Sequence, residues 1–148
     1  MKILNKFAKS DYEVYESVEA GIVLNGAEVK SIKLGQVDLS KGYIKILPNK
    51  FGQHEVWLFG VHIYPYQHAD NAKYDPAHSR KLLLHQREIL SLESRMKQAR
   101  LVVVPLSLYT KSKNIKIELA LARGKKKYEK REDIKKKDVE RDNKRLIK

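Results

Sequence analysis

The feature that most constrains the fold of this chain is an alternation of apolar and polar residues near position 118. Four large aliphatic residues occupy every second position there: Ile115, Ile117, Leu119 and Leu121. A period of two is typical of a β-strand with one face buried and the other exposed to water. A second apolar run, Leu101–Tyr109, precedes it after a short polar connection, so the two segments predict a β-hairpin. Pro105 favours an edge or bulge position in the first strand.

Further short strands are indicated upstream. Tyr43–Leu47 and Val56–Phe59 flank a turn that contains Pro48, Asn49, Lys50 and Gly52. Tyr12–Tyr15 and Glu28–Leu34 are shorter candidate strands. The polar stretch from Asp70 to Ser79 predicts a loop.

Two helices are predicted. Gln86–Ala99 places Ile89, Leu92 and Met96 on one face, which favours an amphipathic helix packed on a sheet. A shorter helix is expected near Val18–Leu24. The fold class is therefore mainly β: a small OB-like antiparallel β-barrel with two or three packed helices, spanning residues 1–123.

The composition changes sharply at Gly124. The whole chain has 31 Lys and Arg against 18 Asp and Glu, a net charge of +13 over 148 residues. Residues 124–148 carry twelve of those basic residues and six acidic ones, with few large apolar side chains. We expect a basic tail that is disordered when free and becomes helical on a partner. The charge favours a polyanionic partner such as nucleic acid.

Several other classes are disfavoured. The sequence has no cysteine, which excludes disulfides and thiolate metal sites. No phosphate-binding loop or nucleophile elbow is present, and the five histidines are too far apart to suggest a metal site. No apolar run is long enough to span a membrane, and the first residues do not resemble a signal peptide. We expect a soluble, cytoplasmic, monomeric protein that is not an enzyme and has no cofactor or metal.

Four segments, taken in order, resemble one known family. They are Asn5-Lys6-x-Ala8 followed by Asp11-Tyr12; Glu19-Ala20-Gly21-Ile22-x-Leu24-x-Gly26-x-Glu28-Val29-Lys30-Ser31; Arg80-Lys81-Leu82-Leu83-Leu84-His85-x-Arg87-Glu88-Ile89; and Gly124-Lys125-Lys126-x-Tyr128-x-Lys130-Arg131. Their order and spacing are similar to those of the SmpB family, the SsrA-binding proteins. Ser10 departs from the pattern, since the family often has His there.

The resemblance implies a function. Family members bind the tRNA-like domain of transfer-messenger RNA (tmRNA) and deliver it to ribosomes stalled on messages without a stop codon. Their tail enters the empty mRNA path near the decoding site. The expected partners are therefore tmRNA and the ribosome.

The resemblance also nominates residues for binding the tRNA-like domain: Asn5, Lys6, Lys9, Glu19, Lys30, Lys33, Arg80, Lys81 and Leu83. Each has an alternative. Asn5 and Glu19 suit an ordinary surface or cap position, the basic residues suit a scattered solvated surface, and Leu83 lies between core candidates Leu82 and Leu84. Tyr12, Tyr43, Tyr64 and Tyr66 could stack on bases, although ring packing in the core explains most of them equally.

In the tail, the residues expected to meet the decoding site are Gly124, Lys125, Lys126, Tyr128, Lys130 and Arg131. Lysine and arginine would neutralise ribosomal RNA phosphates, and the Tyr128 ring could stack on a base. Two other functions stay open: a general RNA-binding barrel of the ribosomal-protein kind with a basic extension, and an RNA-acting enzyme.

Overall fold

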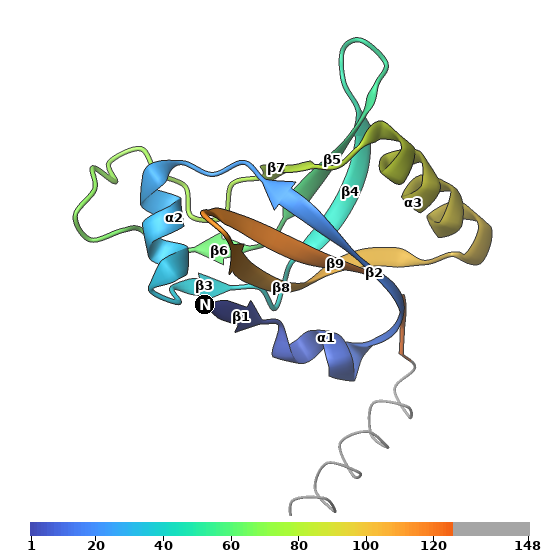
Figure 1. Cartoon of the computed structure of the whole chain (residues 1–148), viewed down its shortest axis with the longest axis horizontal. Helices are drawn as coiled ribbons and strands as arrows, with labels where there is room; N and C mark the ends of the chain where they lie inside the picture. The colour runs from blue at the N-terminus through green and yellow to red at the C-terminus, as the bar shows by residue number, and fades with distance from the viewer. Residues whose placement is uncertain (126–148) are drawn as a thin grey trace, which may run out of the picture.

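A computed structural model describes residues 1–125, and its main element is a seven-stranded antiparallel sheet (Figure 1). The sheet contains β1 (Lys2–Leu4), β2 (Tyr12–Ile22), β4 (Tyr43–Pro48), β5 (His54–Phe59), β7 (Arg80–Leu83), β8 (Val102–Lys111) and β9 (Asn114–Gly124). Their order across the sheet is β1-β8-β9-β2-β7-β5-β4. Two short strands, β3 (Val37–Asp38) and β6 (His62–Ile63), pair separately.

The inner face of the curved sheet holds the core. Ile117 and Leu119 of β9, Leu82 of β7 and Val56 of β5 are all buried there. On the opposite face of β9, Lys116 and Glu118 are partly exposed, because successive side chains of a strand leave on opposite faces. Ala120 and Ala122 also lie on that face but are buried with Val104 in a second, smaller cluster. The predicted half-buried strand is therefore present in the first part of β9, whereas its later part is buried on both faces.

The sheet curls toward a barrel without closing. Gly42, just before β4, packs so tightly on β8 that an added Cβ would lie 2.7 Å from Cγ of Pro105. In the sheet order, however, β4 and β8 are not hydrogen-bonded neighbours. The mainly β, OB-like fold is confirmed, in the form of an open, curled sheet. Both predicted hairpins are present, and the register shifts between Pro105 and Ser107 of β8.

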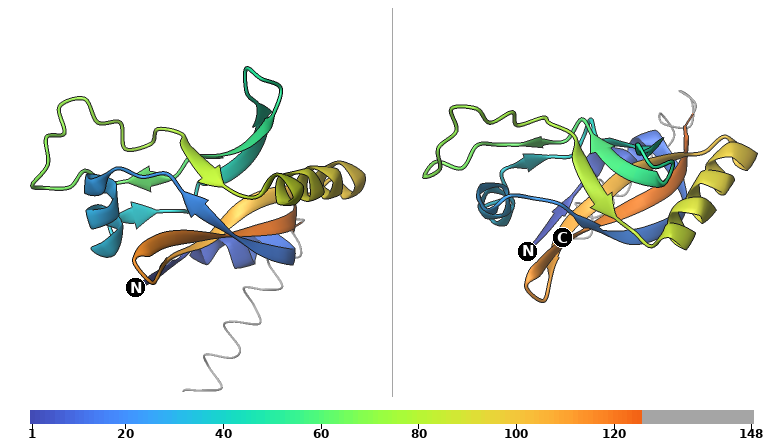
Figure 2. Two further views of the ribbon diagram at one scale, coloured as in Figure 1. Left: turned by 45° about the horizontal axis from the view of Figure 1, so that its top comes forward. Right: turned by 90° about the horizontal axis from the view of Figure 1, so that it is seen from above.

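Within residues 1–125, three helices accompany the sheet: α1 (Lys6–Asp11), α2 (Gly26–Lys33) and α3 (Gln86–Ala99). The bounds of α3 are those predicted, and its buried residues are Ile89 and Leu92. It lies at one end of the molecule and α2 lies at the other, beside the long loop between β6 and β7 (Figure 2).

The prediction of a helix near Val18–Leu24 is wrong, since most of this segment belongs to β2. The strand pairs with β9 along most of its length and with β7 at Gly21 and Ile22. Hydrogen bonds on both sides favour the extended backbone over the modest helical preference of this segment.

The prediction of a strand at Glu28–Leu34 is also wrong. The segment forms most of α2, which begins after an Asn25–Glu28 capping box. The backbone N–H of Glu28 donates to Oδ1 of Asn25 at 2.8 Å, and the Asn25 N–H donates to Oε1 of Glu28 at 3.2 Å. This reciprocal pair satisfies two N–H groups that the first turn of a helix leaves free.

Candidate nucleic-acid interface

Glu19 and Leu83, two of the predicted RNA-binding residues, lie on the same solvent-facing side of the sheet. The register places Gly21 of β2 opposite Leu83 on one side and Lys116 of β9 on the other. One shallow hollow is lined by Glu19, Gly21, Leu83, Leu84, His85, Glu88 and Lys116. We call this region the Glu19–Leu83 surface.

Leu83 is exposed, whereas Leu82 is buried on the inner face. The Leu83 side chain is 53% exposed and packs over Gly21, where an added Cβ would lie 3.2 Å from its own Cβ. An aliphatic side chain held in water above a sheet gains free energy when a partner covers it. The apolar position is therefore available for contact with a base or a ribose.

The carboxylate of Glu19 is held by two neighbours on β8. It accepts hydrogen bonds from the Tyr109 hydroxyl and from Nζ of Lys111, the latter at 3.2 Å. These bonds, that of Tyr109 first, lower the pKa of Glu19, and burial together with the Glu19 contact raises the pKa of Tyr109 to about 12. At neutral pH the site thus presents a fixed carboxylate, which retains lone pairs for an outside donor.

Sequence reasoning missed several residues at or beside this surface, among them Tyr109, Lys111 and Lys116. Lys116 could have been found, because its place in the alternating strand puts it opposite the core. The other two depend on the register between β8, β9 and β2, which the sequence alone does not provide.

The surface extends to α2. A second hollow is lined by Leu24 and Val29 as well as by Leu83, Lys113 and Lys116. Lys30 and Lys33 of α2 are exposed, and Nζ of Lys30 lies 5.3 Å from the ring centroid of Tyr66. Lys111, Lys113 and Lys116 thus lie beside an apolar and a carboxylate contact point, and Lys30 and Lys33 are exposed on α2, an arrangement suited to the phosphates, bases and riboses of a folded RNA.

Asn5 lies elsewhere and is buried. Its side-chain amide donates to the carbonyl oxygens of Leu39 at 3.2 Å and Pro105 at 2.8 Å. Asn5 is the N-cap residue of α1, but its side chain makes no capping bond. In this structure it joins the start of α1 to β8 and to the segment before β4, and the exposed Lys6 follows it.

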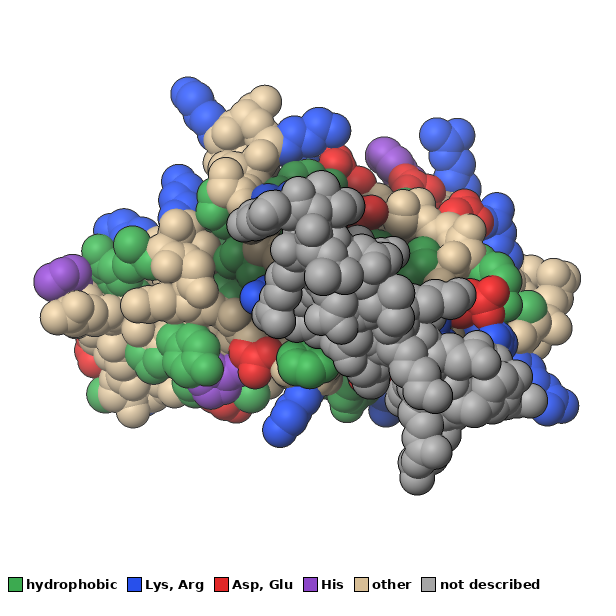
Figure 3. All heavy atoms as spheres, turned by 90° about the horizontal axis from the view of Figure 1, so that it is seen from below, with side chains coloured by type: hydrophobic (Ala, Val, Ile, Leu, Met, Phe, Trp, Pro, Cys, Tyr) green, Lys and Arg blue, Asp and Glu red, His purple; other side chains and the backbone are tan. Residues whose placement is uncertain are grey.

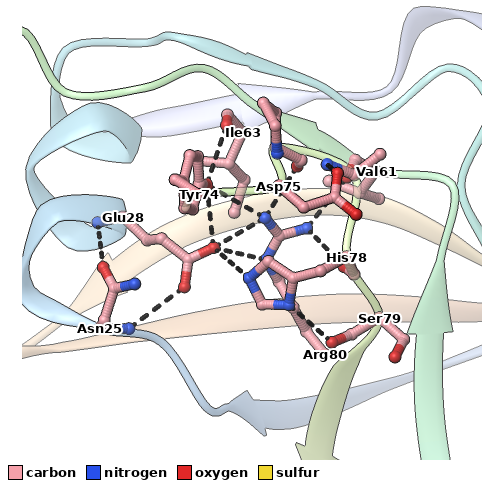
Figure 4. A network of polar contacts seen from close by, with 11 residues as sticks. Asn25, Glu28, Val61, Ile63, Tyr74, Asp75, His78, Ser79 and Arg80 are labelled. Carbon is pink, nitrogen blue, oxygen red and sulfur yellow. Dashed lines mark hydrogen bonds and ion pairs between the residues drawn. The ribbon is translucent and has the colours of Figure 1, made fainter. Parts of the chain in front are cut away.

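Arg80, predicted for the phosphate-binding face, is also buried. Only 2% of it is exposed, and its Nε donates to Oε2 of Glu28 at 2.7 Å (Figure 4). Its other nitrogens donate to the carbonyl oxygens of Val61, Pro76 and His78 and to the Tyr74 hydroxyl. The expectation of a surface phosphate ligand does not fit this structure, because Arg80 lies on the inner face of β7 and its donors are already used.

Lys81, Lys9 and the start of the tail lie on β7, on α1 and at the end of β9. Lys81 is partly exposed, and its Nζ lies 3.8 Å from Oε1 of Glu55. Lys9 lies in α1. β9 ends at Gly124, and the backbone N–H of Lys125 donates to the carbonyl oxygen of Asp11 at 2.9 Å. Lys126, Tyr128, Lys130 and Arg131 lie outside the described residues, so the tail stays a prediction.

The rest of the surface of residues 1–125 carries charges of both signs. Seen from below, Lys and Arg side chains project around the outline of the molecule, with Asp and Glu side chains between them (Figure 3). In this part of the chain no cluster of His, Asp or Glu has the composition of a metal site. No helix in the same range has the length and apolarity needed to cross a bilayer.

The fold and this surface together define a small basic β-sheet protein with an exposed interface suited to folded nucleic acid. Comparison with known proteins narrows the class. The family model described as SmpB protein matches residues 2–148. The chain therefore belongs to the SmpB family.

The names of similar proteins agree with this assignment. The SsrA-binding protein of Oleidesulfovibrio alaskensis is 48% identical over 143 residues, which cover 97% of this chain and 89% of the relative. The SsrA-binding protein of Solidesulfovibrio magneticus is 45% identical over 94% of this chain and 87% of its own length. That of Geobacillus thermodenitrificans is 44% identical over 97% and 89%.

One solved structure is similar along most of the chain. It is described as "tmRNA-SmpB: a journey to the center of the bacterial ribosome". The matched chain is 38% identical, with a TM-score of 0.68 and 85% of each chain covered.

Proposed function

We propose that this chain is a non-enzymatic, cytoplasmic adaptor that binds the tRNA-like domain of tmRNA and delivers it to stalled ribosomes for trans-translation. Membership of the SmpB family and the names of its relatives support this function. The observation that carries it in the structure is the convergence of Glu19 and Leu83 on one exposed surface beside Lys111 and Lys116.

Each part of the Glu19–Leu83 surface has a role in the proposal. Leu83 packs against an exposed base or ribose of the folded RNA. The Glu19 carboxylate accepts a hydrogen bond from a base amino group or a 2′-hydroxyl, and Tyr109 with Lys111 holds it in place. Lys30, Lys33 and Lys116 neutralise phosphates and orient the RNA without reading its sequence.

The test is affinity for a tRNA-like-domain fragment, measured by fluorescence anisotropy. Leu83→Ala removes part of an apolar contact and should reduce the binding free energy by about 1 kcal/mol, so the Kd should rise roughly fivefold. Leu90→Ala is the matched control, since Leu90 is 51% exposed on α3 outside the surface. Glu19→Gln should weaken binding, while Glu16→Gln on the same strand, whose carboxylate pairs with Arg95, should not.

Specificity separates this function from that of a general RNA-binding barrel. Unrelated RNA hairpins should compete poorly with the tRNA-like fragment. Equal competition, or equal affinities of the Leu83→Ala and Leu90→Ala variants, would contradict the proposal.

The tail has a separate role in the proposal. Lys125, Lys126, Lys130 and Arg131 bind ribosomal RNA phosphates near the decoding site, with Tyr128 stacked on a base. Replacing the four basic residues by Gln should largely preserve binding to the tRNA-like fragment and abolish tagging of stalled chains. Normal tagging by this variant would refute the role of the tail.

A further inference from the structure

The outer face of the β4–β5 hairpin carries an aromatic pair that neither the core nor the Glu19–Leu83 surface uses. Tyr43 of β4 lies opposite Phe59 of β5, and their rings stack with centroids 5.5 Å apart and planes 15° from parallel. Tyr43 is 44% exposed. An exposed tyrosine ring on a strand offers a flat face on which another ring can stack.

Lysines accompany this pair. Nζ of Lys45 lies 5.7 Å from the Tyr43 centroid and 5.9 Å from the Phe59 centroid. Lys45 is paired in register with Trp57, and Trp57 is paired with Lys81 of β7. The face therefore repeats an aromatic and basic pattern across three neighbouring strands.

Negative charge is scarce on these strands. Across β4, β5 and β7, all within the described residues, Glu55 is the one carboxylate. It is engaged by Nζ of Lys81 at 3.8 Å and by Nε1 of Trp57, which donates to it at 3.2 Å. A polyanion can thus approach the Tyr43 and Lys45 side chains without meeting a free carboxylate on these strands.

We propose that Tyr43, Lys45 and Phe59 form a second RNA site, which takes an unpaired nucleotide by stacking its base on the aromatic pair and placing its phosphate at Lys45. Bases in an A-form helix are already stacked on each other, so only a single-stranded segment can bind in this way. The residues of this site are distinct from those of the Glu19–Leu83 surface, which contacts a folded RNA.

The chain contains its own reporter for this site. Trp57 is the only tryptophan in the sequence and lies on the same face as Lys45, its partner in the strand register. Titration of the full chain with a short oligo(U) RNA, which forms no stable secondary structure, should change Trp57 fluorescence. Anisotropy of labelled oligo(U) then gives the Kd.

Two variants test the site. Tyr43→Leu keeps apolar bulk on an edge strand but removes the ring, and it should raise the Kd for oligo(U) at least about fivefold. Lys45→Gln should raise the Kd and reduce its dependence on salt by about one phosphate contact. Circular dichroism spectra of both variants should match that of the unaltered chain, which would show that they are folded.

The matched controls are Tyr15→Leu and Lys73→Gln. Tyr15 is 55% exposed on β2, and Lys73 is exposed in the loop between β6 and β7. Neither should change oligo(U) binding. Leu83→Ala should weaken binding of the tRNA-like fragment and leave oligo(U) binding intact, so the two proposals fail separately.

Three results would overturn the inference. One is a Tyr43→Leu variant that binds oligo(U) as well as the unaltered chain does. Another is an equal loss of binding in Tyr43→Leu and Tyr15→Leu. The third is oligo(U) binding with no change in Trp57 fluorescence, which would show that the RNA binds away from this face.

Discussion

The buried pair of Glu28 and Arg80 is expected to be the most sensitive polar point of the fold. Arg80 donates to the carboxylate of Glu28, to three backbone carbonyl oxygens and to the Tyr74 hydroxyl. The side chains of Arg80 and Glu28 are only 1% and 2% exposed, respectively. These bonds join α2, β7 and the long loop before β7, which no other charged pair among residues 1–125 does.

Arg80→Met keeps most of the side-chain length and removes the charge and all of its donors. Because Glu28 is then a buried carboxylate without its arginine, the free energy of unfolding should fall by about 3–5 kcal/mol. With a urea m-value of about 2 kcal/mol/M for a chain of this size, the midpoint should move down by roughly 2 M.

The measurement is a urea titration followed by Trp57 fluorescence and by far-ultraviolet circular dichroism. Trp57 is suitable because its strand pairs directly with β7. Lys81→Met is the matched control, since Lys81 is the neighbouring residue and makes a partly exposed pair with Glu55. That variant should lose less than about 1 kcal/mol.

A double-mutant cycle with Glu28→Gln completes the test. Since both single changes remove the Arg80–Glu28 bond, the double variant should lose less stability than the sum of the two. An Arg80→Met variant as stable as Lys81→Met, or strictly additive losses in the cycle, would refute the account of the buried pair.

Three further outcomes are expected. Burial raises the pKa of Glu28, but the hydrogen bonds with Arg80 and Asn25 outweigh it, so the net shift of the pKa is downward from 4.5. The free energy of unfolding should therefore decrease as the pH falls below about 5 and continue to decrease through the lowered pKa. This acid-dependent loss should be smaller in Arg80→Met. Gly60 has a φ of 76°, and an added Cβ would collide with the carbonyl oxygen of Lys41. Gly60→Ala should therefore lower the free energy of unfolding, measured by urea titration, by at least about 2 kcal/mol. Gly52→Ala, at a φ of 81° with open space around the added Cβ, should lower it less, and equal losses would exclude the collision. Anisotropy titrations in increasing salt should show the affinity for the tRNA-like fragment falling roughly 50- to 150-fold between 50 and 200 mM salt for about four phosphate contacts, whereas a flat dependence would exclude phosphate binding.

Elements with a strong local signal were predicted well. The helix Gln86–Ala99 was found with the bounds of α3, because its apolar residues repeat with the helical period and pack against one side. The strands of β8 and β9 were found from alternation and a short polar connection. In each case the pattern lies within a single segment.

The two wrong secondary-structure predictions have different causes. One segment is decided by contacts with other strands, and the other by a short polar capping motif. Val18–Leu24 reads as a possible helix until β9 and β7 are placed on either side of it. The Asn25–Glu28 capping box was visible in the sequence, but Glu28–Leu34 was interpreted as a short strand. A correct prediction there required recognising the cap as the start of a helix.

The sequence by itself determined that the chain is basic, mainly β, and similar to one RNA-binding family, because charge, periodicity and motif order are properties of the chain as written. Only the tertiary structure decided which face each side chain occupies. Arg80 and Leu83 stand three positions apart in one strand, so one points to the core and the other to solvent. That choice follows from the register of β7 between β2 and β5, which long-range hydrogen bonds fix and no local pattern encodes.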